Sequence, residues 1–165
     1  MRETTCCFTG HRPEKLPWGD REKDPRCVAL KRRLVAAVRD AYEKGYRHFL
    51  CGMAQGGDFY FAEAVLALRA RCSDVRLEAA LPCAGQADAW PEPVRERYNA
   101  ILRQCDAETL LQEAYTPGCM RRRDRYMVRR SSLLIALYGG IPGGTAFTIR
   151  EALNDGLTIV QLAPE

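Results

Sequence analysis

Short apolar runs and segments with helical spacing alternate along the whole chain. The apolar runs are nearly continuous and are bounded by polar or glycine-bearing turns, so they predict buried strands. The predicted strands lie at about 4–9, 47–51, 75–81, 107–111, 132–138 and 157–162. Between them, apolar residues recur every three or four positions, as on one face of a helix. The first such stripe ends at Gly45, a natural helix stop, and consists of Cys27, Leu30, Leu34, Val38 and Ala41.

Strands that are apolar on both faces are typical of a parallel sheet covered by helices on both sides. We therefore predict a Rossmann-like three-layer α/β/α sandwich with a mostly parallel sheet of about six strands. Its 165 residues fit a single domain, residues 1–165. The strand order expected for this fold is 3-2-1-4-5-6. The longest irregular segment, residues 10–25, is long enough to form a flap over a site at the edge of the sheet.

Three glycine-bearing turns, at 9–13, 52–58 and 139–145, each directly follow a predicted strand. In an open parallel sheet such turns meet at the carboxyl ends of the strands, where backbone N–H groups and helix N-termini can hold an anionic ligand. One glycine turn by itself is more often only a tight turn that needs positive φ. Three at the same edge favour a phosphate-bearing nucleotide as the ligand. Thr145 is expected to cap the helix that follows the third turn.

Polar side chains accompany these turns. Arg12 is suited to bidentate contact with a phosphate, with solvent exposure as the alternative. His11 lies beside it, and a packed core imidazole is the alternative to a ligand contact. Asp58 either caps the helix that follows the second turn, which is the commoner use of Asp, or accepts from ribose hydroxyls in the crevice.

The net charge of +4 comes largely from residues 121–130, which hold six arginines and one acid. This local charge favours a local anionic contact over a general nucleic-acid coat. A helix is predicted at 118–131, with an inward stripe of Met120, Asp124, Met127 and Ser131. Asp124 must then be paired or hydrogen-bonded, either to an arginine or backbone donor or to a ligand hydroxyl.

Like charges four residues apart in this helix each destabilise it by about 0.2–0.5 kcal/mol, so an anion should offset them. The first turn of the helix should lie at the ligand edge of the sheet. Arg121, Arg122, Arg123 and Arg125 are therefore ligand candidates, whereas Arg129 and Arg130 should form a solvated basic face.

Eight cysteines and two histidines are present, but no C-x-x-C pair and no zinc-binding spacing occurs. Reduced cysteines packed as small apolar residues are expected, and no metal site. No apolar run approaches the length of a membrane span, and the first residues lack a signal-peptide core, so a cytoplasmic protein without a membrane partner is expected. The sequence leaves open whether the chain forms a homo-oligomer.

Several motifs together resemble the YpsA-like family, in the superfamily that joins the DNA-processing protein DprA to the LOG phosphoribohydrolases (SLOG). The match runs nearly end to end, and its opening motif is fairly specific. The motifs are Phe8 to Leu16 (FTGHRPEKL), Gly57-Asp58, Leu81-Pro82 with Gln86 and Trp90, Arg97-Tyr98, Arg123 to Val128, Leu134 to Ala136 and Gly143-Gly144-Thr145.

This resemblance implies an SLOG-type Rossmann-like domain that binds a nucleotide or nucleotide-derived ligand, such as ADP-ribose, NAD or a nucleoside phosphate. In some members it also implies a link to cell division or stress signalling, but no settled enzymatic activity. The family usually has Asn at the position of Asp124 and often Asp at that of Ser132. Ionised Asp124 can only accept hydrogen bonds, whereas Asn also donates.

Two further hypotheses concern the reaction and the partner. In LOG enzymes, glutamates close behind the glycine loop serve N-glycosidic cleavage, whereas here the first acid after Thr145 is Glu151, so hydrolysis is less favoured. A nucleotide-processing enzyme would have to use Asp58, Asp124 or His11. Single-stranded DNA binding of the DprA type would use the arginines for charge, and Tyr126 and Trp90 for stacking.

The expected ligand contacts combine the three turns with the motif residues. They are Thr9, Gly10, His11, Arg12, Gly52, Gln55, Gly56, Gly57, Asp58, Pro82, Gln86, Arg123, Asp124, Gly139, Gly143, Gly144 and Thr145.

Overall fold

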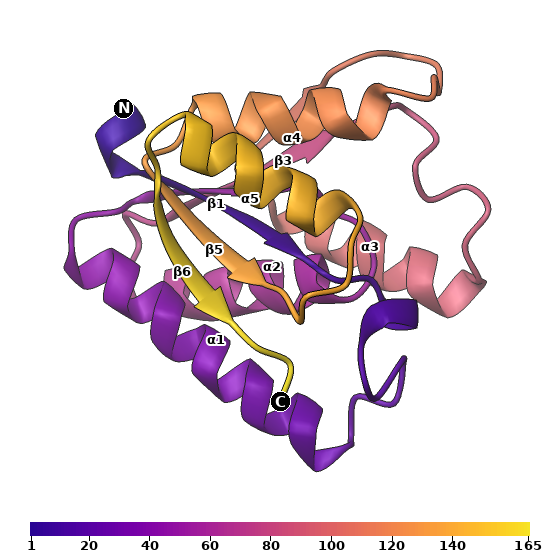
Figure 1. Cartoon of the computed structure of the whole chain (residues 1–165), viewed down its shortest axis with the longest axis horizontal. Coiled ribbons are helices and arrows are strands. Elements are labelled where there is room, and N and C mark those ends of the chain that lie inside the picture. Colours follow the sequence, from indigo (N-terminus) through magenta and orange to yellow (C-terminus); the bar gives the residue numbers. More distant parts are fainter.

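A sheet of six parallel strands forms the middle layer of the computed structural model, which describes residues 1–165 (Figure 1). The predicted fold class is confirmed, and every strand begins and ends within one or two residues of its predicted bounds. The strands are β1 (Thr5–Gly10), β2 (His48–Cys51), β3 (Arg76–Leu81), β4 (Ala107–Leu110), β5 (Leu133–Leu137) and β6 (Thr158–Leu162).

The expected strand order is wrong. The sheet has the order β4-β3-β2-β1-β5-β6, so the chain builds outward from β1 to the edge strand β4 before it crosses back to β5. The fourth strand could have been recognised as an edge strand, because Ala107–Leu110 is largely exposed while its neighbours are buried. The reversal places β1 and β5 side by side, and the crevice that binds ligands in open α/β sheets forms at such a switch point.

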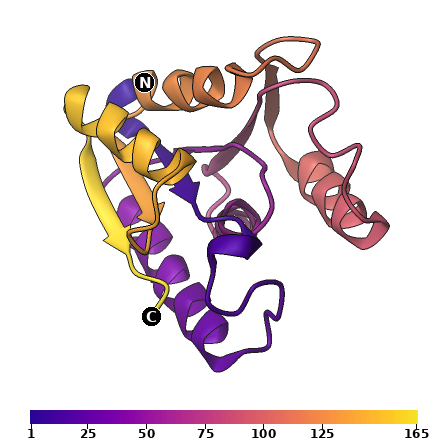
Figure 2. The same ribbon diagram turned by 45° about the vertical axis from the view of Figure 1, so that its right-hand side comes forward.

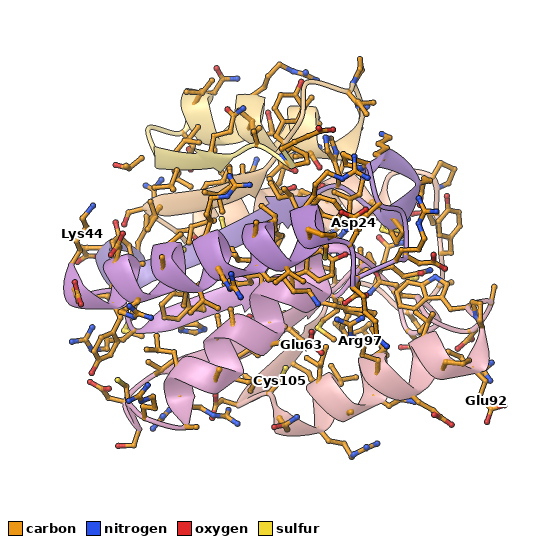
Figure 3. The ribbon with its side chains drawn as sticks, turned by 90° about the horizontal axis from the view of Figure 1, so that it is seen from below. Asp24, Lys44, Glu63, Glu92, Arg97 and Cys105 are labelled. Atoms are coloured by element: carbon orange, nitrogen blue, oxygen red, sulfur yellow. The ribbon has the colours of Figure 1, made fainter.

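Helices cover both faces of the sheet (Figures 1 and 2). α1 (Pro25–Glu43), α2 (Gly57–Arg69) and α3 (Glu92–Gln104) lie on one face, as Figure 3 shows from below. α4 (Cys119–Arg129) and α5 (Gly144–Asn154) pack together on the other. Two short 3-10 turns, η1 (Arg2–Thr4) and η2 (Pro13–Lys15), flank β1. None of the helices combines the length and apolar character needed to cross a bilayer.

The larger core lies between the sheet and α1 to α3. α1 begins where Asp24 accepts a hydrogen bond from the backbone N–H of Arg26 at 2.9 Å, and its buried stripe is the predicted one. Phe8 on β1 stacks on Phe61 of α2, with ring centroids 4.7 Å apart. A smaller cluster around Met127 fills the space under α4 and α5. All eight cysteines are free thiols, and six of them are buried.

Residues 11–24, called the flap below, are tied to this core. Trp18 is buried and its indole N–H donates to Tyr60 Oη at 3.1 Å. Arg97 of α3 holds Glu22 of the flap with two hydrogen bonds of 2.6 and 2.9 Å, and Glu63 of α2 with two of 2.7 and 3.0 Å. Figure 3 shows Glu63 and Arg97 facing each other across the two helices. The flap is therefore held over the carboxyl end of β1 by paired charges as well as by packing.

Candidate functional site

The three glycine turns meet at one edge of the sheet, and His11 joins them. Its backbone N–H donates to the carbonyl of Leu137 at the end of β5 (3.2 Å), and its carbonyl accepts from Gly57 at the start of α2 (3.1 Å). Its ring Nε2 accepts from the backbone N–H of Gly139 at 2.9 Å. Gly56 takes φ 80° beside it, and a Cβ there would lie 2.8 Å from the His11 carbonyl oxygen.

A cavity of about 270 Å³ opens at this meeting point. Its lining includes nine of the expected ligand contacts: Thr9, Gly10, His11, Arg12, Asp58, Arg123, Asp124, Gly144 and Thr145. It also includes six residues that sequence reasoning did not propose: Phe8, Glu14, Lys15, Ala54, Met120 and Met127. The walls thus come from β1, the flap, the turn after β2, α4 and the start of α5.

Backbone N–H groups at the start of α5 supply donors to this cavity. The helix begins at Gly144, and Gly143, with φ 145°, is its cap residue. The expectation that Thr145 caps the helix is wrong: Thr145 is buried in the first turn and its hydroxyl makes no capping bond. The amides of Gly144, Thr145 and Ala146 donate to no group of the chain. They form the positive end of the helix dipole.

Two cations line the same cavity, and one of them, Lys15, lies beside these amides. Lys15 Nζ donates to the carbonyl of Pro142 at 2.9 Å and lies against Gly143, where any Cβ would collide with it. Arg12 is half-buried and has no carboxylate partner, and its one side-chain hydrogen bond is to Met120 Sδ of α4 at 3.9 Å. Neither cation takes part in an ion pair, so both are available to an anion in the cavity. Lys15 was missed because nothing in the sequence fixes the course of the flap.

Carboxylates also line the cavity. Arg123 is buried, and its guanidinium donates to Asp124 Oδ1 at 2.7 Å and to the carbonyl of Gly52. Asp58 Oδ2 accepts from the backbone N–H of Ala54 at 2.9 Å. Asp58 does not cap α2, because Gly56 occupies the cap position. Of the partners expected for Asp124, which were an arginine, a backbone donor and a ligand hydroxyl, the chain supplies the arginine.

The pKa values of Asp58 and His11 are both shifted in this cavity. Burial raises the pKa of Asp58 to about 6, although the guanidinium of Arg123 and the N–H of Ala54 pull it down. Burial, together with the charge of Lys15, lowers the pKa of His11. His11 is therefore a neutral imidazole near neutral pH, with its proton on Nδ1 because Nε2 accepts from Gly139. It serves chiefly to pack and to fix the turns.

The other predicted contacts lie outside the cavity wall. Gly52, Gln55, Gly56, Gly57, Gly139 and Gly143 shape the turns, and Pro82 and Gln86 lie behind Gly52, whose carbonyl accepts from Gln86 Nε2 at 3.3 Å. No set of three or more His, Cys, Asp or Glu side chains is arranged to hold a metal.

Of the arginines of α4 that were expected to contact the ligand, only Arg123 lines the cavity. Arg121 and Arg125 lie over the Phe147 ring of α5, with Cζ atoms 4.7 and 5.1 Å from its centroid. Arg125 also pairs with Glu151 at 2.8 Å. Arg122 donates to the Gln112 side chain at 3.2 Å.

Residues 6–155 match the sequence profile of the YpsA family, described as the YspA SLOG family. A UPF0398 protein of Bacillus velezensis is 27% identical over 147 residues, which span 87% of this chain and 80% of that protein. Among solved structures, DNA processing protein A of Streptococcus pneumoniae superposes with a TM-score of 0.63 at 13% identity, over 96% of this chain and 50% of that one. The same protein of Helicobacter pylori, studied for its single-stranded DNA binding mode, gives 0.65 at 15%, over 97% and 65%. At this identity the structural likeness concerns the fold.

Proposed function

This chain belongs to the YpsA family of SLOG proteins, and from that premise we propose that it binds a nucleotide or nucleotide-derived ligand of the ADP-ribose type. The site is the cavity at the carboxyl ends of β1 and β5. One observation carries the proposal: open helix amides, two cations without an ion pair and two buried carboxylates line the same cavity.

The amides of α5, with Lys15 and Arg12, suit a phosphate. Helix N-termini bind phosphate through their N–H groups, and guanidinium and ammonium groups add charge-assisted hydrogen bonds. The carboxylates of Asp58 and Asp124 are acceptors, so they suit sugar hydroxyls. β1 separates the ends of β2 and β5, which therefore lie two strand spacings, about 10 Å, apart. A ribose with one or two phosphates has its polar groups in this order.

A thermal-shift panel tests the proposal with ADP-ribose, NAD, AMP and ribose 5-phosphate, and with adenosine as the ligand that lacks phosphate. A ligand at about 100 times its Kd adds about 2.7 kcal/mol to the free energy of unfolding, which raises Tm by several degrees. Phosphate-bearing ligands should raise Tm, and adenosine should not. A flat response across the whole panel would contradict the proposal.

A pair of variants locates the phosphate. Lys15→Met removes the cation beside the α5 amides, whereas Lys44→Met removes an exposed lysine just beyond the end of α1 (Figure 3). Loss of one charge-assisted hydrogen bond weakens binding about tenfold or more. Lys15→Met should therefore lower ligand affinity while Lys44→Met leaves it unchanged. Equal affinities of the two variants would place the ligand elsewhere.

Nucleotide hydrolysis is a second candidate, supported by the buried carboxyl of Asp58. With its pKa raised to about 6, this group can exchange a proton near neutral pH, which is a common property of catalytic acids. The position of Glu151 argues against hydrolysis of the LOG type. This residue is the first acid after the glycine loop, and it pairs with Arg125 outside the cavity. Incubation with nucleoside monophosphates and NAD, followed by chromatography, tests for products that Asp58→Asn should abolish. No product at high protein concentration would remove this candidate.

Single-stranded DNA binding is less favoured. The DprA likeness concerns the fold, and both aromatic residues considered for base stacking are engaged within the chain. Tyr126 donates to Glu78 at 2.6 Å and has Arg130 over its ring, and Trp90 packs edge-on against Phe59 and Tyr98. An oligonucleotide arm in the binding panel, repeated at two salt concentrations, tests this alternative, since phosphate contacts make affinity fall steeply with salt.

A further inference from the structure

A second hollow of about 320 Å³ lies at the other end of the sheet, under the last turn of α4. Thr5 and His48, the first residues of β1 and β2, form its floor, whereas the cavity proposed above to bind the nucleotide, called the nucleotide cavity below, begins at Phe8 of β1. Three residues of strand separate Thr5 from Phe8 by about 10 Å. Figures 1 and 2 both show the N-terminus beside the end of α4, so Arg2 completes the wall.

A buried carboxylate orients His48 in this hollow. Glu78 accepts from three donors: His48 Nε2 at 2.9 Å, Tyr126 Oη at 2.6 Å and Thr109 Oγ1 at 2.9 Å. Burial raises the pKa of Glu78, but these bonds outweigh it and bring it to about 2, so Glu78 is a carboxylate at neutral pH. A carboxylate only accepts, so Nε2 carries the hydrogen. Nδ1 of His48 takes part in no hydrogen bond in the chain.

Two guanidinium groups at the same hollow lack a counter-ion. Arg129 makes no hydrogen bond and no ion pair, and Arg130 only lies over the Tyr126 ring, 4.4 Å from its centroid. Both stand at the C-terminal end of α4, where the helix dipole stabilises positive charge without a partner. Arg2, in contrast, is already engaged by Ser131 and Asp155. The site therefore presents two unused cations and one unused imidazole nitrogen.

We propose that this hollow is a second anion site, which binds the phosphate group of a small phosphorylated molecule between Arg129, Arg130 and Nδ1 of His48. The guanidinium groups bind phosphate oxygens as charge-assisted donors. Nδ1, which carries no hydrogen when Nε2 donates to Glu78, accepts from a protonated phosphate oxygen. The carboxylate oxygens of Glu78 accept hydrogen bonds from His48, Tyr126 and Thr109, which offset its negative charge.

The shape of the hollow favours a small molecule over a polymer. Its volume is that of a small-ligand pocket. It shares Tyr126, Arg129 and Arg130 with a neighbouring hollow of about 620 Å³, which gives room for the rest of the ligand. Arg130 already covers the Tyr126 ring, so no nucleic-acid base can stack on that face. The contacts are thus to phosphate rather than to bases.

The two histidines make the site directly observable, because each lies in a different cavity and the chain has no others. Imidazole resonances of the whole protein are followed by NMR during titration with inorganic phosphate and with pyrophosphate, with ionic strength held constant by NaCl. The His48 resonances should shift and saturate. The response of His11 reports on the nucleotide cavity separately, so either site can fail without the other.

Variants connect the shift to the arginines. R129Q/R130Q should weaken the phosphate response of His48 about tenfold or more and leave that of His11 unchanged. R32Q/R39Q, on exposed positions of α1, changes the net charge equally and should bind phosphate as the wild type does. The single variant R129Q, with folding checked by circular dichroism, covers the case in which the double variant is unstable. The proposal would be overturned if the His48 resonances of the wild type did not respond to phosphate or pyrophosphate. It would also be overturned if they responded only to an oligonucleotide, oligo(dT), titrated in the same way, or if both double variants weakened phosphate binding equally.

Discussion

Replacement of Asp58 by Asn should change how the stability of this protein depends on pH. Asp58 is only 6% exposed, and its carboxyl lies in the cavity at the carboxyl ends of β1 and β5 with one hydrogen bond from Ala54. Burial raises its pKa from 3.8 to about 6 even after the opposing pull of Arg123. Asn keeps the shape of the side chain and an acceptor for Ala54 but has no charge to bury. The variant therefore isolates the effect of ionising this one group.

The magnitude follows from the two pKa values. In the unfolded chain the carboxyl loses its proton near pH 3.8, whereas in the folded protein it keeps the proton up to about pH 6. Between these values the folded state binds more protons, so stability falls as the pH rises, and it is constant above and below this window. At 1.36 kcal/mol per pKa unit, moving the pKa from 3.8 to about 6 corresponds to about 3 kcal/mol. Asp58→Asn should thus be more stabilising at pH 7 than at pH 4 by about that amount.

Urea denaturation of the wild type and of Asp58→Asn at pH 4, 5, 6 and 7 measures this difference. Other groups titrate in the same range, but they are common to both proteins and cancel in the comparison. Asp40→Asn, at an exposed position of α1, serves as the matched control and should show no pH-dependent difference from the wild type. If the difference between wild type and Asp58→Asn is the same at pH 4 and pH 7, Asp58 is not buried as described.

Three further outcomes test other parts of the structure. His11 should carry its ring hydrogen on Nδ1, and His48 should carry one on Nε2; long-range ¹H–¹⁵N spectra that lack a hydrogen at either position would contradict the hydrogen bonds. Arg97→Met removes the hydrogen bonds to Glu22 of the flap, so it should lower the free energy of unfolding by about 2 kcal/mol and speed amide hydrogen exchange in the flap. Unchanged exchange would mean that packing alone holds the flap. Gly56→Ala should lower the free energy of unfolding by about 1–3 kcal/mol, and by more than Gly45→Ala does. Both glycines have positive φ, but only Gly56 lies against a backbone oxygen, so equal losses in the two variants would contradict this close approach.

The elements could be predicted from sequence because each is defined by a local pattern. Strands buried on both faces appear as unbroken apolar runs, and α1 appears as a stripe with helical spacing. The order of the strands across the sheet is not defined by a local pattern. The position of β4 depends on which edge of the growing sheet accepts it, and the only local sign is the polar character of Ala107–Leu110.

The candidate site, too, has features that local sequence predicts and features that it does not. Glycine turns after strands could be predicted, since the parallel sheet brings them together and the backbone conformation selects glycine. Side-chain directions could not. Arg121 and Arg125 lie close in sequence to Arg123, yet they turn to Phe147 on the neighbouring helix, while Arg123 turns to the buried carbonyl of Gly52. Helix spacing alone does not tell which neighbour supplies an aromatic ring or an acceptor.

The asymmetry of the cavity follows from the topology rather than from any single residue. β1 has β2 on one side and β5 on the other, and the helices that follow these neighbours, α2 and α5, lie on opposite faces of the sheet. Their first turns therefore diverge around the end of β1 and leave a gap there. Asp58 comes from the side of β2, and the open amides come from the side of β5. If the proposed ligand binds with its phosphate on the amides and its sugar at Asp58, its direction is fixed by the backbone, because no side-chain replacement moves the amides of α5.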